Sequence, residues 1–430
     1  MPYFPEIEEL AKEVHAWADL RREQGGMVAP VMTRLRRELK RVRRDLVHLS
    51  VDRSVNAAEP NNLKAIRKLR PPGPRVMAEG LTDAEYRKRL KGAWLGRATG
   101  CTLGAPVENW PLEAMEGLAQ RCGVAFPPED YWPDHPNPDE PCHNVSRVRD
   151  FLKGHMRAIP ADDDLGYTLL GLLILEAYGP NFTTEQVGEA WLEYLPIACT
   201  AEHITLENLK HAVPAKRAGA KDNPYQEWIG ADIRSDPWAY TAPGWPEKAA
   251  EMAYRDAYLS HRRNGIYGAM YFAAAISAAF ALDDPMEALR VGLTEIPADC
   301  RLAEDIRWAL RKSKSLSDWR EARTFVDRRF RRMHPVHTNN NACLTVFGLA
   351  LGVGNFTRTI GLTVAMGLDN DCTAATAGSL LGAIVGIDGV PVHWWKPFQN
   401  RTRSYLNGAR KFRNTDILRR FEMLRVRPGA

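Results

Sequence analysis

Cysteine is scarce in this chain, and its placement excludes the cysteine-based classes of small protein. The seven cysteines among 430 residues are widely scattered and form no CxxC pair. An odd number of isolated cysteines indicates neither a disulfide framework nor a zinc knuckle. We therefore expect reduced thiols and a cytoplasmic protein.

Long apolar runs are also missing. The longest, residues 268–282, has 15 residues and is rich in alanine, whereas a membrane-spanning helix needs about 20. The opening residues are acidic and amphipathic and lack the basic start and apolar core of a signal peptide. The sequence thus predicts no membrane segment and no export, and the alanine-rich run predicts a buried helix.

Series of alternating apolar and polar residues, the pattern of half-buried strands, are not convincing anywhere. Apolar residues instead recur at helical spacing. The clearest helical patterns span residues 165–177, 184–194, 246–259, 268–282, 286–293, 300–312, 344–351, 357–366 and 373–387. Together with an alanine- and glycine-rich centre and no internal repeat, they predict an all-α fold.

Composition divides the chain near residues 71–74, where the sequence Pro-Pro-Gly-Pro is a strong linker signal. The preceding residues alternate charged and apolar positions at helical spacing, with breaks expected at residues 24–26 and 58–60. A capped helix is expected to begin at residues 81–83. We expect a helical extension over residues 1–75 and the main domain over residues 80–425. The oligomeric state is not predicted.

The net charge of +5 is concentrated in the extension. Residues 1–75 hold 16 Lys and Arg against 10 Asp and Glu, and the remainder holds 42 against 43. Residues 34–44 carry seven basic side chains and one acid on a helical pattern. Such a helix can contact the phosphates of a nucleic acid. Because no aromatic residues are interleaved, a solvated helix face with Glu–Arg pairs is the alternative, and the extension could also cap the core or form a dimerisation hairpin.

Prolines and aromatic residues mark a long surface loop. Residues 127–141 contain six prolines among acids and aromatics, which excludes regular structure, and long ordered loops often cover sites. Aromatic residues in and beyond this loop either stack a base of a ligand or pin the loops to the core. They are Tyr131, Trp132, Trp228, Trp238, Tyr240 and Trp245.

Two acidic segments stand directly before strongly apolar helical patterns. One holds Asp162, Asp163 and Asp164, and the other holds Asp369 and Asp371. A helix start needs one capping carboxylate, whereas five carboxylates drawn toward the interior need cations. If both starts face one cleft, they form an oxygen-rich site for Mg²⁺, with Ca²⁺ or Mn²⁺ as alternatives and room for two ions. Ordinary capping with neutralisation by arginines is the other reading.

Four segments of residues 80–425 resemble, in the same order, motifs of the ADP-ribosylglycohydrolase family. Residues 100–108 are similar to its GDAxGxxxE segment, and residues 162–164 stand where it has Thr-Asp-Asp. Residues 260–269 are similar to its Ser/Thr-His segment, and residues 367–378 to its GxDTDxxxAxxG segment. The resemblance implies an all-α fold that holds two divalent ions, usually Mg²⁺.

The resemblance also implies a set of site residues. The expected metal ligands are Asp162, Asp163, Asp164, Asp369, Asp371 and Cys372. The residues expected to take part in catalysis are Glu108, Asp163 and Asp369, where Glu108 matches the glutamate near the ribose and the attacking water. The residues expected to bind substrate are His261, Asn340 and Asn341, for which capping and buried structural roles are the alternatives.

The sequence departs from the family pattern at four positions. Asp162 and Cys372 replace threonines that bind metal in the family, Cys101 replaces an aspartate, and Leu165 replaces a threonine. Because a thiol is a poor ligand for Mg²⁺, one of the two ions is expected to be weaker, displaced, or bound through Thr373 or water.

The function that the resemblance implies is hydrolysis of a glycosidic bond at the ribose C1 of an ADP-ribosyl conjugate. The expected partner is a ribosyl-containing small molecule or an ADP-ribosylated macromolecule. Two alternatives remain: an N-glycosidase of a small nucleoside or nucleotide, and a non-catalytic module that binds ADP-ribose or a nucleoside.

Overall fold

The computed structural model describes residues 4–77 and 79–429. It divides into two compact units. One comprises the chain up to Ala57 together with Phe330–His334, and the other comprises Ala58–Arg329 and the chain from Pro335 onward.

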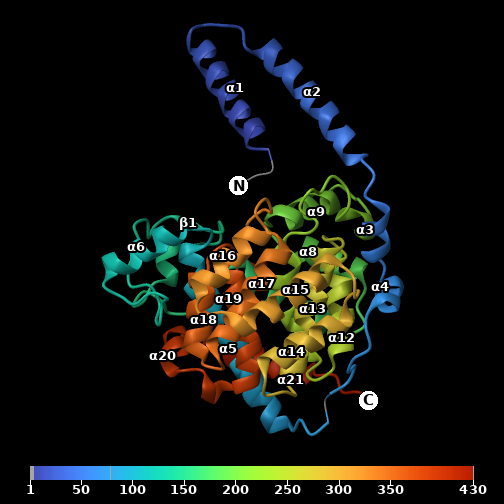
Figure 1. Cartoon of the computed structure of the whole chain (residues 1–430), viewed down its shortest axis with the longest axis vertical. Helices are drawn as coiled ribbons and strands as arrows, with labels where there is room; N and C mark the ends of the chain where they lie inside the picture. The colour runs from blue at the N-terminus through green and yellow to red at the C-terminus, as the bar shows by residue number, and fades with distance from the viewer. Residues whose placement is uncertain (1–3, 78, 430) are drawn as a thin grey trace. The chain divides into compact units, whose positions relative to one another are not determined.

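The first unit consists mainly of the helices of the N-terminal extension, which are α1 (Pro5–Glu23), α2 (Ala29–Val47) and the start of α3 (Arg53–Ala58) (Figure 1). The breaks expected at residues 24–26 and 58–60 are confirmed, because α1 ends at Glu23 and α3 ends at Ala58. Neither α1 nor α2 buries a single residue.

The larger unit confirms the all-α prediction. Its helices are α4 (Leu63–Leu69), α5 (Asp83–Gly104), α6 (Leu112–Cys122), α7 (Asp163–Tyr178), α8 (Thr184–Tyr194), α9 (Thr200–Lys210), α10 (Ala215–Ala218), α11 (Asp236–Thr241), α12 (Pro246–Ala257), α13 (Asn264–Ala279), α14 (Pro285–Gly292), α15 (Arg301–Lys312), α16 (Trp319–Arg329), α17 (Thr338–Gly352), α18 (Phe356–Ala365), α19 (Asn370–Val385), α20 (Val392–Trp395) and α21 (Asn414–Met423). Short 3₁₀ turns lie at Ala105–Val107, Val148–Phe151, Ile229–Arg234, Leu293–Glu295, Ser313–Ser315, Ile387–Gly389 and Lys396–Phe398.

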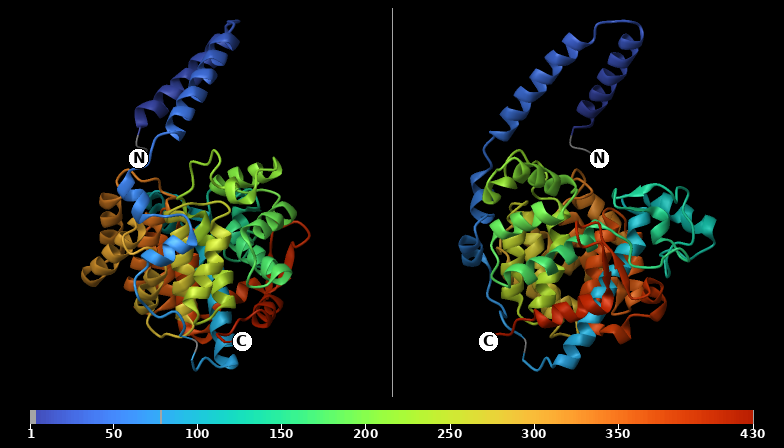
Figure 2. Two further views of the ribbon diagram at one scale, coloured as in Figure 1. Left: turned by 90° about the vertical axis from the view of Figure 1, so that its right-hand side faces the viewer. Right: turned by 180° about the vertical axis from the view of Figure 1, so that it is seen from behind.

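Two small antiparallel ribbons complete the larger unit. Strand β1 (Pro141–Cys142) pairs with β2 (Ser146–Arg147), and β3 (Arg401–Arg403) pairs with β4 (Lys411–Arg413). The ribbon β1–β2 and helix α6 lie together at one side of this unit (Figures 1 and 2). The proline-rich loop leads into β1, so it carries the ribbon that follows it.

Helix α13 lies at the centre of the core. All of its residues are buried, and it packs against α12, α14, α17 and α19. The prediction of a buried helix in the alanine-rich run is therefore confirmed. Among the residues that the structure describes, no helix combines the length and the apolar character that a membrane crossing requires.

Glycines bring α5 and α19 into backbone contact. Gly92, Gly96, Gly100 and Gly104 stand four residues apart and so share one face of α5. A Cβ atom on Gly96 would overlap the carbonyl oxygen of Gly378, and one on Gly104 would lie 2.5 Å from the Cα atom of Asp371. The two helices run antiparallel, so the end of α5 lies against the start of α19.

Residues 58–75 group with the larger unit. Ile66 is fully buried, and Arg70 forms ion pairs with Glu247 and Glu295. The Glu59 carboxylate accepts a hydrogen bond from the Arg301 backbone N–H at 2.9 Å. The expected boundary near residues 75–80 stays a prediction, whereas the described contacts divide the chain near Ala58.

Candidate metal and catalytic site

The first acidic segment forms the start of α7. Asp162 is the N-cap: its side chain accepts the backbone N–H of Asp164 at 3.0 Å, as a helix start requires. Asp162 and Asp164 are buried, whereas the Asp163 side chain is 26% exposed. The apolar residues that follow pull α7 into the core, and its first turn carries the carboxylates inward.

The second acidic segment forms the start of α19. Gly367 and Leu368 take positive φ angles of 70° and 63°, which turn the chain sharply between α18 and α19. The Asn341 side chain in α17 accepts the backbone N–H of Asp369 at 3.3 Å. This turn and this hydrogen bond direct Asp369 and Asp371 toward the first segment.

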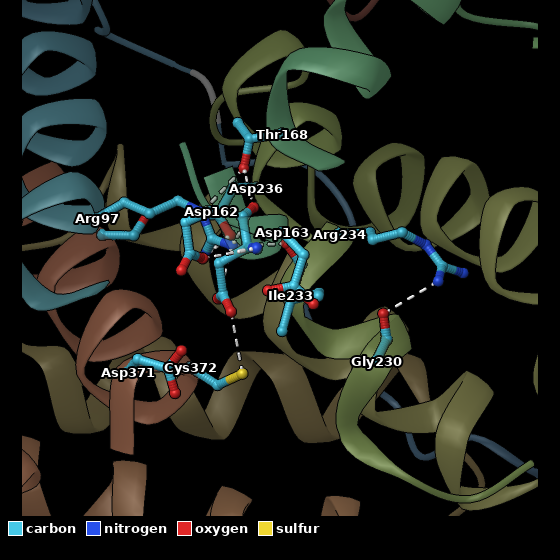
Figure 3. A network of polar contacts seen from close by, with 12 residues as sticks. Arg97, Asp162, Asp163, Thr168, Gly230, Ile233, Arg234, Asp236, Asp371 and Cys372 are labelled. Carbon is cyan, nitrogen blue, oxygen red and sulfur yellow. Dashed lines mark hydrogen bonds and ion pairs between the residues drawn. The ribbon is translucent and has the colours of Figure 1, made fainter. Parts of the chain in front are cut away.

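The two helix starts face each other, as Figure 3 shows for Asp162, Asp371 and Cys372. The Cys372 Sγ atom lies 3.1 Å from Oδ2 of Asp164, although these residues are 208 positions apart in sequence. Potential ligand atoms of Asp164, Asp371 and Cys372 all lie within 4.8 Å of one another. The same holds for Cys101, Asp162 and Asp371.

Arg97 of α5 connects the first acidic segment to the buried core through ion pairs and hydrogen bonds (Figure 3). Its fully buried guanidinium pairs with Asp164 at 3.2 Å and with Asp236 at 2.8 Å. It also donates to the Thr168 hydroxyl at 2.9 Å and to the Ile233 carbonyl oxygen at 2.6 Å. One arginine thus offsets part of the negative charge of the cluster, and among the described residues no lysine or arginine pairs with Asp369 or Asp371.

Three carboxylates of the cluster, those of Asp164, Asp369 and Asp371, are held in an environment that disfavours their charge. For Asp163, by contrast, the effect of burial is outweighed by the contact with His143, which lowers the pKa. Burial raises the pKa of Asp369 to about 7, and the nearby Glu108 carboxylate contributes to this rise. Burial also raises the pKa of Asp371 well above its usual range, again with help from Glu108. For Asp164 the same effect of burial outweighs the opposing Arg97 charge. Raised carboxylate pKa values in one cluster are expected where a cation belongs.

His143 is a site residue that sequence reasoning missed. It lies in the turn between β1 and β2, with a φ of 49°, and its imidazole enters the acidic cluster. Nε2 lies 2.6 Å from Oε2 of Glu108, and Nδ1 lies 2.9 Å from Oδ2 of Asp162 and 3.3 Å from Oδ1 of Asp163. Burial lowers the pKa of His143, but the surrounding carboxylates raise it well above its ordinary value.

Glu108 follows the short turn at the end of α5. Its Oε1 accepts a hydrogen bond from the Asn109 side chain at 2.7 Å, and its Oε2 contacts His143. The side chain is 22% exposed. The close packing of α5 on α19 therefore delivers one partly accessible carboxylate to the edge of the buried cluster.

The three residues expected to bind substrate have other neighbours. His261 is fully buried and hydrogen-bonds to the Ser260 hydroxyl at 2.8 Å, and burial lowers its pKa well below the usual value. Asn341 donates to the backbone carbonyls of Pro335 and His337, just before α17, and accepts the backbone N–H of Asp369. The side-chain oxygen of Asn340 accepts the Asn341 backbone N–H at 3.0 Å. Substrate contacts for all three stay predictions.

Aromatic residues of the proline-rich loop hold it to the core. The indole N–H of Trp132 donates to the Leu103 carbonyl oxygen at 3.0 Å, and the Tyr131 hydroxyl donates to the Trp394 carbonyl oxygen at 2.7 Å. Both side chains are buried, as are Trp238 and Tyr240.

All seven cysteines are free thiols.

Comparison with known proteins identifies the family. The sequence model of the ADP-ribosylglycohydrolase family matches residues 82–422. The chain belongs to this family. A solved structure described as an "ADP-ribosylglycohydrolase-related protein complex" is similar with a TM-score of 0.53 and 20% identity, covering 79% of this chain and 98% of that chain. At this identity the likeness shows the fold alone. No curated protein sequence matches the chain.

The ADP-ribosylglycohydrolase match places the end of α5, the start of α7 and the start of α19 within one family domain. The ribbon β1–β2 with His143 lies inside the matched range as well. The helices α1 to α4 precede it.

Proposed function

We propose that this member of the ADP-ribosylglycohydrolase family is a divalent-cation-dependent enzyme that cleaves an N- or O-glycosidic bond at the ribose C1 of an ADP-ribosyl conjugate. One observation carries the proposal above all: the acidic starts of α7 and α19 face each other beside Glu108. A family with this activity and a cluster of this composition support the same reading.

The donor atoms fit a hard divalent cation. Oδ1 of Asp369 and Oδ1 of Asp371 are buried and accept no hydrogen bond among the described residues. Buried carboxylate oxygens without a partner cost free energy, which a bound cation recovers. The residues that would hold the ions, two Mg²⁺ by our expectation, are Asp163, Asp164 and Asp371, with Asp162 and Cys372 beside them. We add Asp369 on the evidence of its unpartnered Oδ1. When bound, such an ion polarises ribose hydroxyls and the attacking water.

The chain's own residues have separate tasks in this proposal. Glu108 is partly exposed, so its carboxylate can accept a proton from water that approaches C1. Asp163 is also partly exposed and is available to a ribose hydroxyl. Asp369 is buried and fixed through its backbone by Asn341, so it keeps the orientation of the second helix start.

The test is hydrolysis of N-linked and O-linked ADP-ribosyl conjugates by the full chain, with Mg²⁺ or Mn²⁺ and after removal of cations with a chelator. We expect cation-dependent release of ADP-ribose, and a loss of at least about 100-fold in Glu108→Ala and Asp369→Ala. Glu113→Gln, an exposed acid in the nearby helix α6, is the matched control and should retain activity.

Three outcomes would overturn the proposal. Unchanged activity in both Glu108→Ala and Asp369→Ala would remove the assigned roles. Binding of ADP-ribose without turnover under any divalent cation would favour the non-catalytic module. Turnover of free nucleosides in preference to the conjugates would favour the N-glycosidase.

A further inference from the structure

A second feature of the larger unit is a strongly basic cavity that the proposed reaction does not use. The ribbon β3–β4 forms its wall, and its volume is about 1010 Å³. Seven arginines and lysines line it, against a single carboxylate, that of Asp416. A cavity lined by one sign of charge concentrates ligands of the opposite sign.

The register of the ribbon places like charges directly opposite each other. Arg401 in β3 pairs with Arg413 in β4, and Arg403 pairs with Lys411. All four side chains are exposed, and all four line the cavity. Like charges at directly opposed positions of an antiparallel pair are destabilising. An anion seated between them would convert this repulsion into attraction.

Few carboxylates of the protein itself neutralise these cations. Arg420 has a bidentate ion pair with Glu176, whereas Arg403 has only a distant one, 3.8 Å from Asp150. Within the described ranges, no carboxylate pairs with Arg401, Lys411 or Arg413. The cavity therefore keeps an excess of unpaired cations.

Two stretches of chain connect the cavity to the acidic cluster. Ile159 bridges to β3: it donates its N–H to the Arg401 carbonyl oxygen at 2.8 Å and accepts the Arg403 N–H at 3.0 Å. Asp162 follows Ile159 by three residues, so the Cα atoms of these two residues are at most about 11 Å apart. Beyond β3, Tyr405 packs against Gly166 in the first turn of α7. A ligand in the cavity would thus lie close to the proposed reaction site.

We propose that this cavity binds the phosphodiester backbone of a nucleic-acid strand, and that the conjugate acted on is an ADP-ribosylated nucleic acid. The second half of this inference rests on the proposed function. Guanidinium groups present planar pairs of donors that match phosphate oxygens. Cations spread over a cavity of this size suit repeated phosphates rather than one. The Phe412 ring is not open for stacking on a base, because the Arg420 guanidinium lies over it, 5.4 Å from the ring centre. We therefore expect backbone contacts and little sequence preference.

The test measures binding of a fluorescently labelled single-stranded oligonucleotide to the full chain by anisotropy over a series of salt concentrations. The double variant Arg401→Gln/Arg413→Gln should bind at least tenfold more weakly. The slope of log affinity against log salt should become shallower by about 1.4, since two phosphate contacts are lost. Arg36→Gln/Arg37→Gln, an exposed pair in the basic segment of α2, tests the competing site in the extension and should bind like the unaltered chain. Lys64→Gln/Lys68→Gln, an exposed pair on α4, is the matched control and should also bind like the unaltered chain.

Further arms separate this inference from the proposed function. Glu108→Gln should lose hydrolysis and keep oligonucleotide binding, because Glu108 lies outside the cavity lining. Loss of binding in the α2 pair instead of the ribbon pair would overturn the inference, as would a chain that binds no oligonucleotide. Two further results would also overturn the inference. One is displacement of the oligonucleotide by a polyglutamate peptide at equal charge concentration, and the other is tighter binding of free ADP-ribose than of the oligonucleotide in the cavity.

Discussion

Gly104 at the end of α5 and Asp371 at the start of α19 lie backbone to backbone: a Cβ atom on Gly104 would lie 2.5 Å from the Cα atom of Asp371. Because Gly104 has no side chain, the start of α19, which carries candidate ligands, can pack directly against the end of α5. The same contact repeats one turn earlier, where a Cβ atom on Gly100 would overlap the Ala374 carbonyl oxygen.

Gly104→Ala should move the start of α19 and weaken binding of divalent cations. The added methyl group meets backbone, which has little freedom to yield, so we also expect a loss of about 1–3 kcal/mol in the free energy of unfolding. Calorimetric titration with Mn²⁺ and urea unfolding measure the two effects. Gly117→Ala in α6 is the control, because its Cβ would meet only the end of Arg121 at 3.7 Å; it should keep cation affinity and gain up to about 1 kcal/mol. Equal cation affinity in the two variants would contradict this account.

Arg97→Met should be strongly destabilising. The substitution leaves the carboxylates of Asp164 and Asp236 buried without their shared cation, and loss of one partner of a buried pair costs about 3–5 kcal/mol. Urea unfolding measures the change. Arg87→Met is the control: Arg87 is exposed in the same helix and pairs with Glu422 near solvent, so its loss should cost less than about 1 kcal/mol. Similar costs for the two variants would show that Arg97 is not the internal counter-charge of the cluster.

His143→Gln should increase the dependence of stability on divalent cations. Without added cation, the His143 imidazole is the group that enters the cluster and contacts Glu108 and Asp162. Its removal leaves the carboxylates more crowded, so the cation-free protein should unfold at a lower temperature, and addition of Mn²⁺ should raise Tm by more than in the unaltered chain. His155→Gln, an exposed histidine on the same stretch, is the control. An unchanged rise in Tm for His143→Gln would contradict the assigned role.

Much of the site could be predicted from the sequence, because its carboxylates occur in two compact segments before apolar helices. Asp162 and Asp371 could be predicted from their position before apolar helices, and Glu108 from its motif. His143 carries no such signal: it stands in a two-strand ribbon after the proline-rich loop, and only the path of that loop brings it to the cluster. The like charges of Arg401 and Arg413 were also invisible, since their opposition depends on strand register. Fold class followed from helical periodicity, whereas contacts between distant loops did not.

Glu202 should make stability depend on pH. Burial raises the pKa of Glu202 to about 7 from an ordinary value of 4.5, against the opposing charge of Arg234. The folded state therefore binds this proton more tightly than the unfolded state. The resulting contribution is fully present below pH 4.5 and is lost as the pH rises through about 7.

The matched variant is Glu202→Gln, which cannot titrate. Between pH 4.5 and pH 7 the unaltered chain should lose about 3 kcal/mol relative to this variant, because one pKa unit corresponds to about 1.4 kcal/mol. Urea unfolding at several pH values measures the difference. A difference that stays constant over this range would contradict a raised pKa for Glu202.

The most direct measurement of the central claim is anomalous scattering from crystals of the full chain soaked in Mn²⁺. If the starts of α7 and α19 form one cation site, an anomalous peak must lie between the carboxylates of Asp163 and Asp164 and those of Asp369 and Asp371, and it must vanish in Asp369→Ala. No peak at that position, or a peak that persists in this variant, would contradict the account.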